Sequence, residues 1–197
     1  MANVDAPFGL CPITNPYGTT PRLNEYTVTD SIAVYPNQLV CMTAGKLVSF
    51  TTTLALAGEV VGVCAGHVST TDTDRKTQVY DDPDQLFAIQ SDDASLTALA
   101  DYQHLLFSIV NAKSANTTLL HSTSELVGAS GTSIPGAFDA TGVMPLLCVG
   151  KVEATENEIG SGISWTQFKV KITPTYHLNG MGGVGAIAGV TFTGEGT

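Results

Sequence analysis

Short apolar and β-branched stretches alternate with turn residues along the middle of the chain. Hydrophobic side chains at every second position are typical of strands with one buried face. The pattern predicts strands over residues 26–29, 32–35, 38–42, 46–53, 59–65, 85–90, 118–121, 146–154 and 163–173. Ala44-Gly45 predicts a hairpin turn, and Gly62 predicts a bulge or a close backbone approach. Residues 70–84 are polar and predict a loop.

One segment has a different period. Leu96, Leu99 and Leu106 lie at rough helical spacing in residues 94–109, which contain no Gly or Pro. Ser91 supplies a candidate N-cap before them. The chain therefore predicts a mainly β domain over residues 25–177, a small barrel or sandwich with one short helix near residues 94–109.

Proline is concentrated at the N-terminus. Four of the nine prolines fall in the first 21 residues. Proline fixes φ and lacks an N–H donor, so residues 1–24 predict an extended arm. Apolar side chains in such an arm suggest docking onto another molecule. The predicted docking residues are Pro7, Phe8, Gly9, Leu10 and Pro12.

The C-terminal residues 178–197 are rich in glycine. They also carry Val184, Ile187, Val190 and Phe192. A solvated linker has little use for such side chains, so this Gly-rich tail predicts a second packing strap.

Three blocks of the sequence resemble a known family. They are the opening Ala-Asn-Val-Asp-Ala-Pro-Phe-Gly-Leu at residues 2–10 with Pro12, the run Asp-Gln-Leu-Phe-Ala-Ile-Gln at residues 84–90, and a C-terminal block at residues 145–150, 157–158 and 168–172. In this order they resemble small tailed-bacteriophage head decoration, or cement, proteins. Cys11 departs from the pattern, because family members carry Arg there, and an Asn is expected near Thr173.

The resemblance implies a function. It implies a virion structural protein that binds the assembled capsid from outside and stabilises it, after assembly in the host cytoplasm. The implied partners are the major capsid protein and two further copies of the chain, as a homotrimer over threefold positions.

Charge excludes several other partners. The chain has 8 basic and 18 acidic side chains, a formal charge of −10. It lacks the positive surface that neutralises phosphates, so we expect no nucleic acid partner. Anionic lipid would repel it, and no apolar run has the length of a membrane helix, so we expect no membrane partner.

Eight aspartates cluster within residues 72–101. A divalent cation site and a solvated, turn-rich segment both fit such a cluster. The spacing lacks the Gly and terminal Glu of a calcium-binding hand, which favours the turn-rich interpretation.

The sequence lacks a convincing catalytic or metal-binding motif. Residues 180–185 match Gly-x-Gly-x-x-Gly, but too little chain follows for a dinucleotide-binding unit. Four histidines lack ligand-pair spacing, and four cysteines, Cys11, Cys41, Cys64 and Cys148, lack any Cys-x-x-Cys and predict reduced thiols. We therefore expect no enzyme, no cofactor and no metal.

Two alternatives stay open. One is a phage tail or head-fibre module that binds a host glycan through Trp165 or residues 70–84, although core packing is the favoured role of Trp165. The other is an enzyme whose histidines and aspartates are brought together by the fold.

Overall fold

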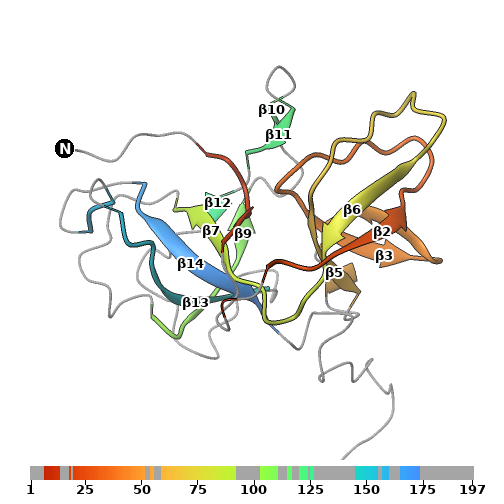
Figure 1. The fold of residues 1–197 in the computed structure, drawn as a ribbon. Coiled ribbons are helices and arrows are strands. Elements are labelled where there is room, and N and C mark those ends of the chain that lie inside the picture. The colour runs from red at the N-terminus through yellow and green to blue at the C-terminus, as the bar shows by residue number, and fades with distance from the viewer. Residues whose placement is uncertain are drawn as a thin grey trace, which may run out of the picture.

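A computed structural model of the chain describes residues 7–13, 18, 20–51, 54–55, 59–91, 103–110, 115–116, 120–123, 125–126, 145–154, 157–159 and 165–173. These residues form a mainly β structure with two five-stranded antiparallel sheets, as predicted (Figure 1). The sheets are not closed into a barrel, which removes the barrel from the two predicted architectures. Val28 makes only an isolated bridge with Leu47 at the margin of one sheet.

Sheet I has the strand order β1-β7-β14-β13-β8. Its strands are β1 (Cys11–Pro12), β7 (Phe87–Gln90), β14 (Gln167–Ile172), β13 (Leu146–Lys151) and β8 (Leu106–Phe107). Burial alternates along β13 and β14, so their pairing confirms the last predicted antiparallel pair. Sheet I thus joins the N-terminal, middle and C-terminal parts of the chain.

Sheet II has the strand order β2-β6-β5-β3-β4. Its strands are β2 (Leu23–Thr27), β6 (Lys76–Tyr80), β5 (Val60–Cys64), β3 (Leu39–Thr43) and β4 (Lys46–Ser49). Two small ribbons accompany the sheets: β10 (Ala115–Asn116) with β11 (His121–Ser122), and β9 (Ile109–Val110) with β12 (Glu125–Leu126).

Two predicted glycine positions are confirmed. Ala44 and Gly45 have φ of 48° and 75° and connect β3 to β4, as a two-residue hairpin requires. At Gly62 a Cβ would lie 2.1 Å from the carbonyl oxygen of Tyr80. The register of β3 against β5 shifts at the same place, so Gly62 marks both a bulge and a close approach.

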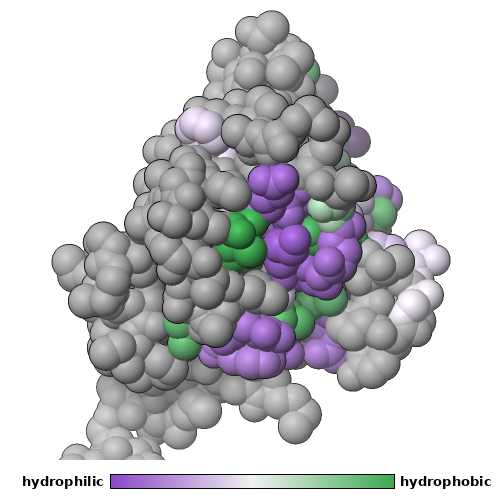
Figure 2. All heavy atoms as spheres, turned by 90° about the vertical axis from the view of Figure 1, so that its left-hand side faces the viewer, coloured by the Kyte–Doolittle hydropathy of each residue, from purple (hydrophilic) through white to green (hydrophobic). Residues whose placement is uncertain are grey.

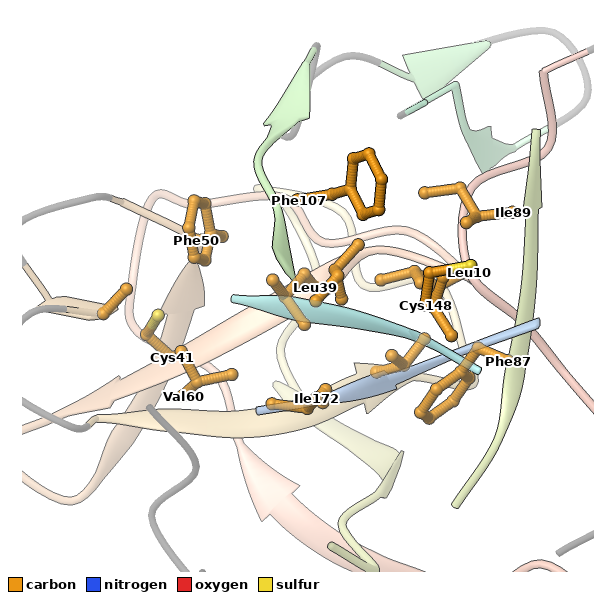
Figure 3. Packing of buried hydrophobic residues seen from close by; sticks show 14 of the residues in the cluster. Leu10, Leu39, Cys41, Phe50, Val60, Phe87, Ile89, Phe107, Cys148 and Ile172 are labelled. Atoms are coloured by element: carbon orange, nitrogen blue, oxygen red, sulfur yellow. The ribbon is translucent and has the colours of Figure 1, made fainter. Parts of the chain in front are cut away.

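The main hydrophobic cluster is shared by both sheets. Leu39 and Cys41 of sheet II pack in it with Phe87 and Phe168 of sheet I (Figure 3). A second cluster, which contains Val40, lies on the opposite face of sheet II. Apolar side chains therefore pack on both faces of the central strands of sheet II, and every residue of β5 is buried.

The predicted helix is wrong over its C-terminal part. Residues 106–107 form β8 and residues 109–110 form β9, and residues 92–102 lie outside the described part of the chain. His104 has a φ of 68°, which an α-helix does not allow. Phe107 is buried opposite Leu146 while Leu106 is only half-buried, so these two apolar residues serve a strand rather than a helix.

The predicted polar loop also contains a strand. β6 lies between β2 and β5, although its sequence is Lys-Thr-Gln-Val-Tyr. Thr77 and Val79 are buried, whereas Lys76 and Gln78 are exposed. The inward positions include a threonine, so the hydrophobic pattern of this strand was too weak to detect.

Candidate functional site

The N-terminal segment, residues 7–13, is built into the chain's own structure. Leu10 donates its backbone N–H to the Asn37 carbonyl at 2.8 Å, and the Asn37 side-chain amide donates to the Phe8 carbonyl at 3.0 Å. Ile13 donates to the Leu86 carbonyl at 2.9 Å. Leu10 is fully buried in the main cluster (Figure 3). The segment therefore holds the two sheets together.

Gly9 allows the backbone of residues 7–13 to follow this path between the two sheets. Its φ is +73°, and a Cβ would lie 2.5 Å from the Asn37 carbonyl oxygen and 2.8 Å from the Ser122 Cβ. Ser122 is itself held by donating its N–H to the Pro36 carbonyl at 2.9 Å. Only glycine fits both the left-handed backbone and the space.

The predicted docking residues therefore divide into two groups. Gly9 and Leu10 are buried within this chain, and a capsid contact by these two residues stays a prediction. Pro7, Phe8 and Pro12 are half-buried, and their contact with a capsid stays a prediction. The extended conformation fits β1, which pairs Cys11 with Ala88 at the edge of sheet I.

The strand β2 begins at Leu23, which lies inside the predicted arm of residues 1–24. It is attached to the sheet through Asp81, which is 1% exposed. The Asp81 carboxylate accepts hydrogen bonds from Asn24 Nδ2 at 2.7 Å, Tyr26 Oη at 2.7 Å and Arg22 Nε at 3.2 Å. Burial alone raises the pKa of Asp81, but the Asn24 and Tyr26 hydrogen bonds and the Arg22 charge outweigh it and hold the pKa below its ordinary value.

An open polar pocket lies beside β2 and β6. It has a volume of 310 Å³ and is lined by Glu25, Ala65, Gly66, His67, Lys76, Thr77 and Gln78. Lys76 Nζ lies 2.9 Å from Glu25 Oε1 at this site. The His67 ring lies 4.9 Å from the Tyr35 ring, which adds an aromatic surface. Sequence reasoning missed this pocket, because its residues come from three separate segments.

Two of the aspartates in the acidic cluster order the backbone of turns. Asp72 accepts a hydrogen bond from the Ser69 N–H at 2.6 Å, and Asp82 accepts one from the Asp84 N–H at 2.9 Å. These contacts are those of turn-forming aspartates. In the described ranges no group of three or more His, Cys, Asp or Glu side chains is placed to hold a metal ion. Asp92, Asp93 and Asp101 lie outside those ranges.

Trp165 does not have the role that was favoured for it. It is half-buried, has a φ of 59° and belongs to neither hydrophobic cluster. Its carbonyl accepts a hydrogen bond from the Gln90 side chain at 3.3 Å. Because Trp165 is half-buried and belongs to neither cluster, the prediction of core packing is wrong.

The four cysteines are free thiols, as predicted. Burial raises the pKa of Cys41 to about 11 and that of Cys148 to about 12, and it also raises the pKa values of Cys64 and Cys11. The thiolate is the reactive form, so these cysteines are poor nucleophiles. The Gly-rich match at residues 180–185 lies outside the described residues.

The outward positions of sheet I mix charged and apolar side chains. Lys171 lies opposite Leu147 in the β13–β14 pair, and its Nζ is 4.0 Å from Asp84 Oδ1. Figure 2 shows hydrophilic and hydrophobic surface side by side on this side of the molecule.

No family model, curated protein or solved structure matches the chain. No helix in the described part is both long and apolar enough to cross a membrane.

Proposed function

We propose that this chain is a virion structural protein that binds the exterior of an assembled bacteriophage capsid and stabilises it. One observation carries the proposal. The second and third sequence blocks that resemble head decoration proteins supply β7, β14 and β13, which are consecutive neighbours in sheet I, and the first block reaches the same sheet through Pro12 of β1, the strand that pairs with β7. Blocks far apart in the sequence thus form one structural unit, as expected if they resemble the family for a shared structural reason.

The proposed stabilisation follows from mass action. A protein that binds the assembled shell and not its free subunits makes opening of the shell more costly. The formal charge of −10 disfavours contact with packaged nucleic acid. The proposed partners are the major capsid protein and further copies of this chain in a homotrimer, and no catalytic step, cofactor or metal is assigned.

In this proposal the N-terminal segment contacts the capsid through those of its residues that are not buried in the core. Phe8 is half-buried, while its neighbours Gly9 and Leu10 fix the backbone from within. Such a fixed segment loses little conformational entropy on docking. Pro7, Phe8 and Pro12 are therefore the proposed capsid contacts.

Co-sedimentation with emptied, expanded shells of the cognate phage tests this proposal. We expect saturable binding of the wild-type protein and at least fivefold weaker binding of Phe8→Ala, because aromatic residues dominate protein contacts. Tyr35→Ala is the matched control, since it removes a half-buried aromatic from the segment that precedes β3. Thermal unfolding of both variants checks that they are folded. Wild-type protein that fails to bind shells would contradict the function, and equal binding by Phe8→Ala would contradict the arm contact alone.

The open pocket beside β2 and β6 favours a second candidate function, a tail or head-fibre module that binds a host glycan. Its polar lining and the adjacent Tyr35–His67 pair resemble the mixture of polar and aromatic groups that binds sugars. On a glycan array this function predicts binding that Gln78→Ala weakens and Phe8→Ala leaves unchanged. A silent array together with shell binding would exclude it.

A further inference from the structure

The strand β2 (Leu23–Thr27) has an open outer edge. It lies at the end of the strand order of sheet II and pairs with β6 on one side only (Figure 1). Four of its five residues are exposed, and Leu23 is one of two exposed large hydrophobic residues in the described part of the chain. Exposed edges of this kind are templates for a further strand.

The alternation of hydrogen bonds between β2 and β6 shows which backbone groups of β2 face away from the sheet. Val28 donates to the Arg75 carbonyl at 2.7 Å, in the same register as the β2–β6 pairs. Hydrogen-bonded and non-hydrogen-bonded pairs alternate in an antiparallel ladder, so Asn24 and Tyr26 direct their backbone groups to β6. The N–H and C=O groups of Leu23 and Glu25 consequently point away from the sheet.

The free edge is short and has defined ends. On the C-terminal side Val28 bridges Leu47, and Thr29 donates to the Leu47 carbonyl at 2.8 Å. On the N-terminal side Pro21 has no N–H to donate. Pairing with another strand is therefore limited to the part of β2 around Asn24.

We propose that β2 pairs with β2 of a second copy of this chain, antiparallel about a two-fold axis at Asn24. In this register Leu23 and Glu25 exchange backbone hydrogen bonds with Glu25 and Leu23 of the second copy. Arg22 then lies opposite Tyr26 of the second copy. A register centred on Glu25 would instead place two like charges opposite each other.

Local charge permits this contact. Two copies repel overall, since each carries a formal charge of −10. At β2 the charges are balanced, because Lys76 lies 2.9 Å from Glu25 and Arg22 lies 3.2 Å from Asp81. The edge is thus a place where a second acidic copy can approach.

The pairing is small compared with the roughly 1,200 Å² that stable interfaces bury. It should therefore give a reversible dimer that depends on concentration, and a capsid surface would raise the local concentration of copies. This contact does not rest on the proposed capsid function, and it differs from the threefold arrangement that the family resemblance implies.

Sedimentation velocity of the full chain, from micromolar to near-millimolar concentration, tests the register. Leu23→Lys places a lysine opposite Glu25 of the second copy, and Leu23→Glu places a glutamate there. We expect the dimer dissociation constant of the lysine variant to be about tenfold lower than that of the glutamate variant. Thr43→Lys and Thr43→Glu, at an exposed position at the end of β3, control for the change in net charge.

A second pair of variants tests the edge itself. Among the backbone groups, Glu25→Pro removes only the outward N–H and leaves the bonds to β6 in place, so it should abolish the dimer. Glu25→Thr keeps the N–H and should retain it, and circular dichroism checks that both variants fold. The proposal would be overturned if neither the wild type nor Leu23→Lys formed a dimer. It would also be overturned by a trimer that Glu25→Pro leaves unchanged. A third contradicting result would be that the Lys and Glu variants at Thr43 change the dissociation constant as much as those at Leu23 do.

Discussion

Gly9 and Gly45 have nearly the same backbone angle but different surroundings. Their φ values are +73° and +75°, yet a Cβ at Gly9 would meet Asn37 at 2.5 Å, whereas nothing lies within 4 Å of one at Gly45. We expect Gly45→Ala to cost about 1 kcal/mol of unfolding free energy through backbone strain. Gly9→Ala should cost about 3 kcal/mol, because overpacking adds to the strain. Urea unfolding of the two variants measures the difference, and equal costs would show that Gly9 is not confined.

Asp81 makes the attachment of β2 dependent on pH. Its pKa in the folded protein lies below the ordinary value of 3.8. The carboxylate therefore stabilises the fold above about pH 4, and this stabilisation is lost as the pH falls through the folded pKa. At pH 7 we expect Asp81→Asn to cost about 2 kcal/mol, since a buried charged acceptor is lost.

The difference in unfolding free energy between wild type and Asp81→Asn should shrink as the pH falls below about 4. Denaturant unfolding of both proteins across the acid range measures it. A difference that stays constant with pH would show that the charge of Asp81 does not stabilise the fold.

At the scale of elements, Asn157 holds the ends of β13 and β14. Its side-chain amide donates to the carbonyls of Val152 and Gln167 at 2.8 Å, and its Oδ1 accepts the Gln167 N–H at 2.8 Å. We expect Asn157→Ala to cost about 2–3 kcal/mol, because it leaves buried backbone groups unpaired. Glu153→Ala, at an exposed position near the same turn, should change stability by less than about 0.5 kcal/mol. Thermal unfolding compares the two variants, and similar melting temperatures would contradict the role of Asn157 in holding the ends of β13 and β14.

The elements that could be predicted are those whose burial alternates clearly. β13 and β14 place an apolar side chain inward at nearly every second position, so their pairing was visible in the sequence. β6 was not predicted because Thr77 occupies an inward position, and β8 was not predicted because it is only two residues long. A short apolar pair fits a helix and a strand equally well, and only the partner strand decides between them.

The candidate site was predictable only in part. The sequence indicated that Leu10 packs against something but not which molecule it contacts, and in the structure Leu10 packs in the chain's own main cluster. The free edge of β2 could not be predicted either. Its position at the end of sheet II follows from pairings between segments far apart in the sequence.

At the scale of the whole molecule, the shared main cluster couples the two sheets. Cys41 on β3 and Cys148 on β13 are both fully buried in it, one from each sheet. Burial raises their pKa values to about 11 and about 12, so neither thiol reacts readily in the folded protein at pH 8. Labelling of these thiols therefore reports the opening of each sheet.

We expect Cys41 and Cys148 to become reactive at the same denaturant concentration, because the main cluster that buries both thiols is lost when either sheet unfolds. Alkylation at increasing urea, followed by mass spectrometry of the labelled peptides, follows each cysteine without mutation. Half-buried Cys11 is the internal control and should react at lower urea than the other two. If Cys41 reacted at clearly lower urea than Cys148, sheet II would open while sheet I stays folded, and the shared cluster would not make the two sheets one cooperative unit.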